Sequence, residues 1–401
     1  MNIFIINSGS SSIKYQLFKM PVEQPVCSGL IERIGLENSL IRHKSFLNGE
    51  EKVVERTVDL PDHEAGLQEV LELLTDPEIG VIKNPEEIDA VGHRVVHGGE
   101  AFAATTFITG EVKDKIKQLF PLAPLHNPAN YMGIDVAERI FTAARQIAVF
   151  DTAFHQTMPE KAFRYAIPKS FYTEQKIRAY GFHGTSHKYV SEQAMDYLKN
   201  PAAKLITIHL GNGCSLTAVK EGRSVDTSMG FGPLSGLIMG TRSGDIDPSI
   251  IFHLINQLGY DPEQVNTLLN KRSGMLGMTG FSDMRDIENA INEGSEDSEL
   301  ASELYAYRIR KYIGAYAAVL NGLDAIVFTA GVGENDISMR QRICDNLEFL
   351  GIEADPEKNR IRSATLREIN KSGSRVKILV IPTNEELEIA KQCFELLNEQ
   401  L

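Results

Sequence analysis

Several residues in this sequence have side chains that could handle a phosphate or a carboxylate group. Arg94 lies in the strand-like run 90–96, and a guanidinium can hold either anion through two parallel hydrogen bonds. Arg242 lies among glycines and other small residues, which allow a ligand to approach it closely. His183 stands between an aromatic residue and a glycine, and its ring could donate to a reacting phosphoryl group. Taken singly, each residue is also explained by a structural role, such as an ion pair for Arg94.

Two acidic residues stand where a strand is expected to end, and they are candidates for the same site. Asp151 directly follows a short apolar run. A carboxylate at the carboxyl end of a strand commonly faces the site of an α/β fold, although Asp also caps turns. Glu385 follows another apolar run and opens a helical pattern that Thr383 or Asn384 could cap. It is either a first-turn acid stabilised by the helix dipole or a metal ligand.

Three segments rich in glycine or serine could hold an anion with their backbone N–H groups. The first is Asn7–Ser12, and Lys14 adds a positive charge just after it. The second is Gly211–Gly213, and the third is Gly331–Asn335, which we predict to be a turn after a buried strand. Glycine permits close approach of a phosphate, and the crevice after a strand is where α/β folds hold nucleotides. The chain has no Walker A loop and no dinucleotide fingerprint, so a Rossmann dehydrogenase is disfavoured.

The elements that must position these residues alternate between strands and helices. Residues 3–18 read as a strand–turn–strand hairpin, and residues 205–219 repeat it about half a chain later. Further strands are predicted at 90–96, 146–150, 324–329 and 376–381, and helices at 64–74, 130–144 and 298–320. This alternation predicts an α/β fold with two related halves.

Composition restricts the class of protein. The chain has 401 residues, more than a single compact core accommodates, so two domains are expected with a boundary just after Phe150. Its formal net charge of −13 argues against nucleic acid as a partner. The N-terminus lacks a signal-peptide pattern, no stretch approaches the ~20 apolar residues that span a bilayer, and no Cys-x-x-Cys pair occurs. These features predict a soluble, reduced, cytoplasmic protein with no nucleic-acid and no membrane partner.

Together, these segments resemble the acetate kinase family. The matching strings run in order along nearly the whole chain: Asn7–Lys14, Gly92–Gly99, Asp151–His155, Tyr180–His187, His209–Gly213, Gly240–Asp245, Gly331–Asn335 and Pro382–Glu386. The resemblance implies the α/β fold of actin, the sugar kinases and the heat-shock chaperone ATPases, with a duplicated core and an interdomain cleft. It implies an N-terminal domain at 1–150 plus 386–401, on the substrate and phosphate side, and a nucleotide-binding domain at 151–385.

The resemblance also implies roles residue by residue. Asn7 and Glu385 would position Mg²⁺, for which Mn²⁺ could substitute. Arg94 would grip the substrate carboxylate, and the catalytic residues would be Asp151, His183 and Arg242. A small apolar pocket for a methyl group would be formed by Val96, Leu125, Phe182 and Pro233. ATP or ADP would be held by Lys14, His209, Leu210, Gly211, Asn212, Gly213, Asp283, Met284, Arg285, Gly331, Val332, Gly333, Glu334 and Asn335.

The activity that the resemblance implies is reversible, Mg-dependent transfer of a phosphoryl group from ATP to acetate, directly and in line, by a homodimer. A carboxylate with a pKa of about 4 is already ionised at neutral pH. We therefore expect Asp151 to orient a group or to bind metal-bound water rather than to accept a proton.

Two alternatives stay open. The first is a kinase for propionate or another short fatty acid, because a pocket distinguishes one methylene by only about 1–3 kcal/mol. The second is an ATP-driven binding module of the actin or chaperone kind. It gives no reason for the joint presence of four residues: Arg94, Asp151, His183 and Arg242.

Two positions depart from the family's pattern. Met284 replaces an aromatic residue near the adenine, so stacking there would be weaker. Cys214 stands where Ala or Ser is usual. Neither is expected to touch the chemistry.

Overall fold

The computed structural model describes residues 1–47 and 49–399. Over this range the chain forms two compact units. The first is Met1–Phe154 together with the chain from Asn384 onward, and the second is His155–Thr383.

The divisions expected from the sequence, after residues 150 and 385, lie a few residues away from these. As a consequence, Asp151 and Glu385 belong to the first unit and not to the second. The reason is local. The N–H of Asp151 donates to the carbonyl of Val95 in the first sheet at 3.0 Å. Asn384 caps the helix that begins at Glu385, by accepting from the N–H of Leu387.

The first unit is built on a mixed sheet. Its strands are β1 (Asn2–Ser8), β2 (Ser12–Lys19), β3 (Pro25–Glu32), β4 (Ser39–Leu47), β5 (Glu50–Val58), β6 (Ala90–Val95), β7 (Thr106–Phe107) and β8 (Arg145–Phe150). Within the described residues their order is β5-β4-β3-β2-β1-β6-β8-β7. β1 and β2 form the predicted hairpin, while β6 runs parallel to both β1 and β8. The carboxyl ends of β1, β6 and β8 therefore lie at the same end of the sheet.

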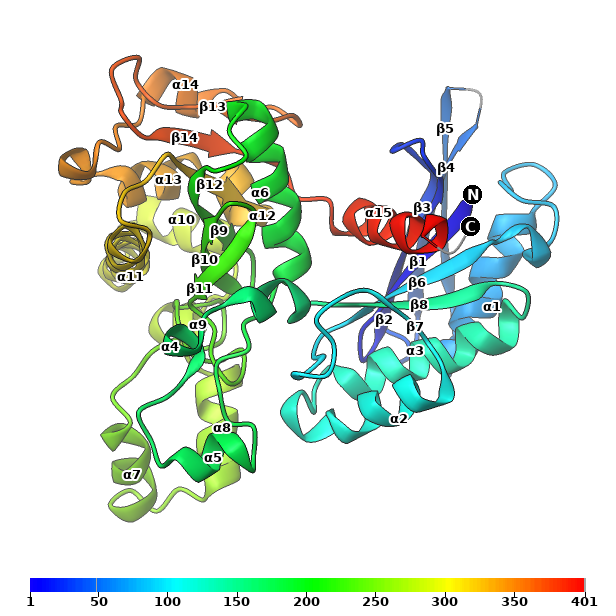
Figure 1. The fold of residues 1–401 in the computed structure, drawn as a ribbon, viewed down its shortest axis with the longest axis horizontal. Coiled ribbons are helices and arrows are strands. Elements are labelled where there is room, and N and C mark those ends of the chain that lie inside the picture. Colours follow the sequence, from blue (N-terminus) through cyan, green and yellow to red (C-terminus); the bar gives the residue numbers. More distant parts are fainter. Residues whose placement is uncertain (48, 400–401) are drawn as a thin grey trace. The chain divides into compact units, whose positions relative to one another are not determined.

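Helices cover both faces of this sheet (Figure 1). They are α1 (His63–Thr75), α2 (Gly110–Gln118), α3 (Asn127–Ile140) and α15 (Glu385–Asn398), with short 3-10 helices η1 (Pro85–Glu87) and η2 (Phe120–Leu122). α1 and α3 pack on one face, where Phe4 and Phe141 join a common core. α15 packs on the other face, where the backbone of Gly92 meets Ile389 and Cys393.

The predicted helix at 130–144 is wrong at both ends. α3 begins at Asn127, with a proline in its first turn, where the missing N–H of proline has no helical partner to lose. It ends at Ile140 because Phe141 adopts φ −105° and ψ 63°, outside the helical region. The chain then enters β8 at Arg145.

The second unit repeats the core of the first. Its strands are β9 (Lys204–Leu210), β10 (Cys214–Lys220), β11 (Arg223–Thr227), β12 (Ala325–Thr329), β13 (Arg367–Glu368) and β14 (Lys377–Val380). In the described part of the chain their order is β11-β10-β9-β12-β14-β13. β9 and β10 form the second predicted hairpin, and β12 is parallel to β9 and β14. This arrangement matches β3-β2-β1-β6-β8, so the predicted duplication is confirmed.

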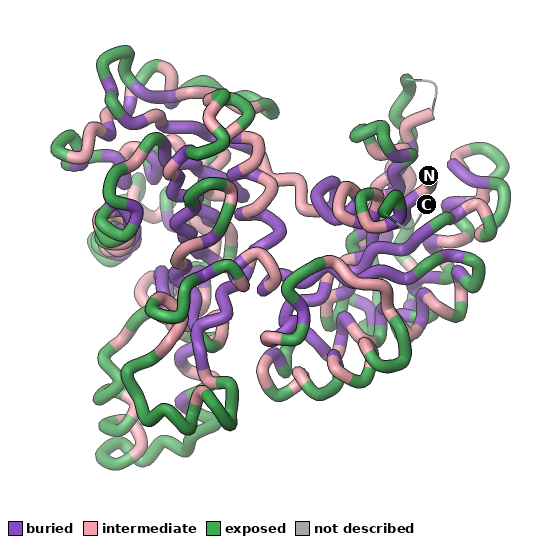
Figure 2. The backbone as a smooth tube through the Cα atoms, viewed as in Figure 1, coloured by how far each residue is buried: buried purple, intermediate pink, exposed green. Residues whose placement is uncertain are grey.

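The helices of the second unit are α4 (Glu160–Phe163), α5 (Lys169–Thr173), α6 (Gly184–Leu198), α7 (Ser249–Asn256), α8 (Pro262–Lys271), α9 (Gly274–Thr279), α10 (Met284–Asn292), α11 (Glu296–Leu320), α12 (Ala330–Asn335), α13 (Ile337–Cys344) and α14 (Pro356–Arg360), with η3 (Ala153–Thr157) at the division of the units and η4 (Glu348–Leu350). α6 and α11 cover opposite faces of the sheet: Ser215 of β10 contacts His187 of α6, whereas its neighbour Cys214 contacts Tyr305 of α11. Figure 2 shows the central strands of both units as buried and α7 as exposed.

No helix among residues 1–47 and 49–399 is long and apolar enough to cross a membrane.

Candidate active site

Arg94 and Asp151 form a tight ion pair at the carboxyl edge of the first sheet. The parallel pairing of β6 with β8 places Arg94 beside Val149, and Asp151 follows two residues later. Nε of Arg94 donates to both carboxylate oxygens of Asp151 at 3.1 Å, and Nη2 donates to Oδ2 at 2.6 Å. Asp151 is only 1% exposed. This buried, multiply hydrogen-bonded carboxylate fixes the plane of the guanidinium.

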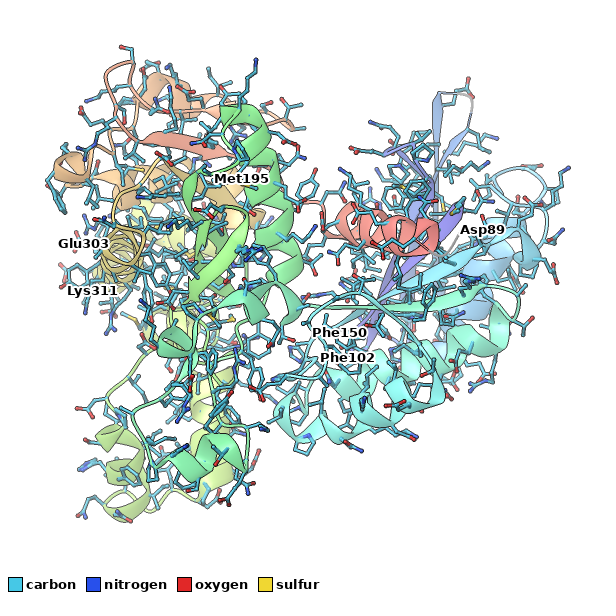
Figure 3. All side chains as sticks on the ribbon, viewed as in Figure 1. Asp89, Phe102, Phe150, Met195, Glu303 and Lys311 are labelled. Carbon is cyan, nitrogen blue, oxygen red and sulfur yellow. The ribbon has the colours of Figure 1, made fainter. Side chains whose placement is uncertain are left out.

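An aromatic pair supports this strand end. The rings of Phe102 and Phe150, labelled in Figure 3, are stacked with centroids 4.3 Å apart and planes 7° from parallel. A Cβ at Gly98 would lie 2.9 Å from the ring of Phe150, so only glycine fits between the loop and the ring. The N–H of Gly98 donates to Oγ1 of Thr152 at 2.9 Å, which ties the loop after β6 to the residue after Asp151.

The N-terminus of α15 brings further charges to Arg94. Lys14 of β2 forms an ion pair with Glu386 at 2.7 Å. Burial is the main effect on the pKa of Glu385 and raises it. Arg94 lowers this pKa, whereas Asp151 and Glu386 raise it, and the net shift is upward. Burial likewise opposes the charge of Arg94, but the carboxylates of Asp151 and Glu385 outweigh it and raise the guanidinium pKa above its ordinary value.

Acidic side chains gather around Arg94 at this end of the sheet. The carboxylates of Asp151, Glu385 and Glu386 act on one another here, together with the cations Arg94 and Lys14. Among the described residues no group of three His, Cys, Asp or Glu side chains is arranged to hold a metal ion by itself. Mg²⁺ does not require such a group, because it keeps several waters and takes one or two protein ligands together with substrate phosphates.

The other predicted residues of the first unit lie on the same elements. Asn7 is near the carboxyl end of β1, paired with Lys14 of β2. The N–H of Val96 donates to Oδ1 of Asn130 on α3 at 3.0 Å, and Val96 is buried. Leu125 lies just before α3 and is 58% exposed. An apolar side chain this exposed is available to a ligand but does not by itself define a pocket.

In the second unit, His183 and Arg242 meet at Gly213. A Cβ built on Gly213 would lie 3.3 Å from Nε2 of His183 and 3.8 Å from Nη1 of Arg242. Both side chains therefore border the same point beside the backbone of the β9–β10 turn. His183 has φ 56° and ψ 24°, a left-handed conformation that is costly for a residue with a Cβ. Such strain is characteristic of functional positions.

Arg242 is held in place by the backbone of a neighbouring loop. Its Nη1 donates to the carbonyl of Pro233 at 2.9 Å, and burial lowers its pKa from the ordinary value. Phe182, the residue before His183, is almost fully buried. Of the four residues predicted to line the methyl pocket, the second unit thus contains Phe182 and Pro233, and the first contains the other two.

A cavity of about 740 Å³ lies beside this turn, within the second unit. Its lining includes all three segments that the sequence predicted for nucleotide binding in this unit. The lining residues are Gly211, Asn212, Gly240, Met275, Ser282, Asp283, Met284, Arg285, Glu288, Tyr305, Gly331, Val332, Asn335, Asp336 and Arg362. His209, Leu210, Gly213, Gly333 and Glu334 belong to the same segments but do not line it.

The third glycine segment is a helix and not the predicted turn. α12 spans Ala330–Asn335 directly after β12, so Gly331 presents its backbone as part of a first helical turn. Oε1 of Glu334 accepts from the N–H groups of Ala330 and Thr383 at 2.9 and 3.1 Å. The carboxylate of Glu334 therefore fastens the ends of β12 and β14, which is a structural contact.

Several cavity residues are not marked by the sequence. Met275, Ser282, Glu288 and Arg362 lie in helices or loops without a local motif, so no signal points to them. Gly240 belongs to a Gly-rich string that the sequence does single out, and a Cβ there would collide with Oδ1 of Asn212.

Of the two departures from the family's pattern, one lines the cavity and the other contacts residues that line it. Met284 lines it. Cys214 donates from Sγ to the carbonyl of Gly211 at 3.3 Å and contacts the hydroxyl of Tyr305 at 3.0 Å. Burial raises the pKa of Cys214 to about 11, so its thiol stays protonated and unreactive.

Known proteins resemble this chain over nearly its whole length. Residues 2–391 match the model of the acetokinase family. An acetate kinase of Flavobacterium johnsoniae is 62% identical over 397 residues, covering 99% of this chain and 100% of the relative. The crystal structure of a Porphyromonas gingivalis acetate kinase matches with a TM-score of 0.91 and 45% identity, covering 99% of both chains. A propionate kinase of Francisella tularensis matches with a TM-score of 0.91 and 42% identity, covering 98% of both chains.

The duplicated sheets and their paired glycine turns define an α/β phosphotransferase with the actin-like, sugar-kinase type of fold, as predicted. The chain belongs to the acetokinase family.

Proposed function

We propose that this chain catalyses the reversible, Mg-dependent transfer of the γ-phosphoryl group of ATP to acetate, giving acetyl phosphate and ADP. The observation that carries the proposal is the meeting of His183 and Arg242 beside Gly213, at the turn whose Gly211 and Asn212 line the 740 Å³ cavity. The family assignment and the names of the relatives support the same activity.

The transfer is direct and in line. A carboxylate oxygen of acetate forms a bond to the γ-phosphorus while the bond to the bridging oxygen of ADP breaks, so the electron pair leaves with ADP. Negative charge spreads over the three equatorial oxygens in the transition state. Arg242 and His183 supply a positive charge and an N–H donor there, and their effect is largest where that charge develops. Inversion at a chiral γ-phosphorus is the signature of this single displacement.

Arg94 binds the carboxylate of acetate, and Asp151 positions Arg94. Three hydrogen bonds from Arg94 to Asp151, between 2.6 and 3.1 Å, hold the guanidinium in one orientation. The nucleophile needs no base because it is already ionised at neutral pH. Asp151 therefore acts without exchanging a proton.

Asn7 and Glu385 would hold Mg²⁺, or Mn²⁺ in its place, since both ions prefer oxygen ligands. Bound there, the ion would supply positive charge that offsets the charge of the phosphate groups. The nucleotide is held by Lys14 and by the predicted segments at 209–213, 283–285 and 331–335. Met284, in place of an aromatic residue, packs on the base through its polarisable thioether.

Substrate size is set by Val96, Leu125, Phe182 and Pro233. We expect acetate to be the preferred substrate, with propionate used about 10-fold less efficiently and butyrate less again, because one methylene is worth about 1–3 kcal/mol in a fitted pocket. A hydroxamate assay for acyl phosphate with MgATP and each acid measures this directly. Equal or faster turnover of propionate would mean that the chain is a propionate kinase, which is the activity named for the Francisella tularensis relative. ATP hydrolysis without any acyl phosphate would favour an actin-like or chaperone-like binding module.

The proposed metal role of Glu385 predicts a Mg-dependent, pH-dependent stability. Because the folded-state pKa of Glu385 is raised, the folded chain keeps a proton that the unfolded chain has lost, and stability falls as pH rises through that window. Mg²⁺ should offset this loss only where Glu385 is ionised. The increase in melting temperature on adding Mg²⁺ should therefore be largest at alkaline pH and should shrink as the pH is lowered through the raised pKa of Glu385.

The variant Glu385→Gln should lose this Mg-dependent increase while an exposed control on the same helix, Glu395→Gln, keeps it. A Glu385→Gln protein that still gains stability from Mg²⁺ as the wild type does would remove Glu385 from the metal site.

We also propose that the protein works in the cytoplasm as a homodimer, with no nucleic-acid or membrane partner. The net charge of −13 supports the part of this that concerns nucleic acid.

A further inference from the structure

A chain of hydrogen bonds runs from His183 into the buried centre of the second unit. Nδ1 of His183 lies 2.9 Å from Oγ of Ser215, and the same hydroxyl lies 2.8 Å from Nε2 of His187. Nδ1 of His187 lies 2.7 Å from Oγ1 of Thr207, which donates in turn to the carbonyl of Thr217 at 3.4 Å. Ser215, His187 and Thr207 are all fully buried.

The hydroxyl of Ser215 has one proton, which decides how protons are distributed along the chain. It can donate to only one of its two imidazole partners and must accept from the other. When His183 is an imidazolium, its Nδ1–H donates to Ser215. The hydroxyl must then donate to Nε2 of His187, whose remaining proton sits on Nδ1 and is accepted by Thr207. Every donor in this arrangement has an acceptor, ending at a backbone carbonyl.

We propose that Ser215, His187 and Thr207 form a positioning relay that fixes the proton of neutral His183 on Nδ1, so that His183 donates to the transferring phosphoryl group only as an imidazolium. This proposal rests on the transition-state role of His183 given under the proposed function. Nε2 is the nitrogen that borders Gly213 and Arg242. With Nδ1 committed to Ser215, Nε2 carries a proton only when the ring is charged.

Neutral His187 fits this relay. Burial lowers the pKa of His187 well below its ordinary value, with His155 and His209 adding to the shift. The groups packed around His183 include His209, whose ring stacks on it with centroids 4.2 Å apart, and Arg242 across Gly213. Arg242 opposes a charge on His183, whereas the incoming triphosphate favours one. The charged form is thus promoted when the nucleotide is bound.

Replacing Thr207 by valine tests the relay without altering any group that touches His183. Without the hydroxyl, the buried Nδ1–H of His187 has no acceptor, so the arrangement needed by the imidazolium becomes costly. We expect the pKa of His183 to fall by about one unit, a tenfold change in its protonation equilibrium. The proton of neutral His183 should move from Nδ1 to Nε2.

The measurement is ¹⁵N NMR of the full chain labelled at its 10 histidines, with His183→Gln to assign the signal. Wild type should show neutral His183 protonated on Nδ1, and Thr207→Val and Ser215→Ala should show Nε2. Ser215→Thr, which restores a hydroxyl, should return the wild-type pattern. Ser191→Ala, which removes a buried hydroxyl on α6 that donates to the carbonyl of Lys188, should leave it unchanged.

The pH dependence of kcat for acyl phosphate formation from acetate and MgATP gives the second readout. Its alkaline limb should coincide with the pKa of His183 and should move about one unit lower in Thr207→Val. Neutral wild-type His183 protonated on Nε2, or a His183 pKa that Thr207→Val leaves unchanged, would overturn the relay. Absence of acyl phosphate in wild type would instead overturn the proposed function, while the NMR result would still decide the relay.

Discussion

Replacing Arg242 by alanine is expected to lower kcat for acyl phosphate formation by about 10³-fold, with KM for acetate and ATP changing little. The guanidinium borders the same point as Nε2 of His183, where charge develops on the phosphoryl oxygens. An interaction that is stronger in the transition state than in the ground state appears in kcat and not in KM. Steady-state kinetics with coupled detection of ADP measures both parameters.

The size of this effect follows from how Arg242 is held. One of its nitrogens is already bonded to the carbonyl of Pro233 at 2.9 Å, so the guanidinium is oriented before the substrates bind. Arg242→Lys keeps a charge but not the planar fork and should recover only a small part of the loss. Arg139→Ala, which removes two exposed ion pairs, with Glu64 of α1 and Asp135 of α3, is the control and should behave as wild type. A large rise in KM at unchanged kcat would mean that Arg242 binds ground-state substrate.

The sequence predicts the elements that carry their own local signal. The hairpins β1–β2 and β9–β10 are each a strand-like apolar run, a short turn rich in Gly or Ser, and a second strand-like run, which together indicate antiparallel pairing. The strands β6, β8, β12 and β14 are short apolar runs whose ends are marked by residues of the site. The duplication of the core is therefore already recognisable in the amino-acid pattern.

The errors have physical causes that a local pattern does not contain. The helix boundary at Ile140 depends on the backbone of Phe141, and the sequence pattern alone continues past it. Gly331–Asn335 is expected to be a turn because glycines usually interrupt helices. The contacts of Glu334 with the ends of β12 and β14 have no local signature, since Thr383 is far along the chain.

The sequence identifies candidate residues of the site, but it does not indicate which residues they form hydrogen bonds with. Arg94 and Asp151 are separated by 57 residues, and nothing in either segment indicates that one binds the other. The same holds for His183 and Ser215, which are 32 residues apart. The sequence marks Ser215 only as part of a strand, yet its hydroxyl joins two imidazoles. Such contacts come from tertiary packing, which brings together segments whose local sequences do not indicate the contact.

Replacing Arg94 by alanine is expected to raise KM for acetate by about 100-fold while kcat falls much less, because a charge-assisted pair to a carboxylate is worth about 2–5 kcal/mol when it is desolvated. The same change removes the guanidinium that is hydrogen-bonded to Asp151, which is 1% exposed. Removing one partner of a buried ion pair costs about 3–5 kcal/mol of stability, so the variant should also melt at a lower temperature.

The double variant Arg94→Ala/Asp151→Asn separates the two effects. It also removes the buried negative charge that Arg94 balances in the wild type, so the melting temperature should recover most of the way to wild type. KM for acetate should stay about 100-fold raised, because the carboxylate of the substrate still has no guanidinium to bind. If KM recovered together with stability, the loss in Arg94→Ala would come from a distorted fold, and the substrate carboxylate would have to be bound elsewhere. Since Asp151 accepts three hydrogen bonds from Arg94, Asp151→Asn alone should raise KM for acetate by a smaller factor, through a less firmly oriented Arg94.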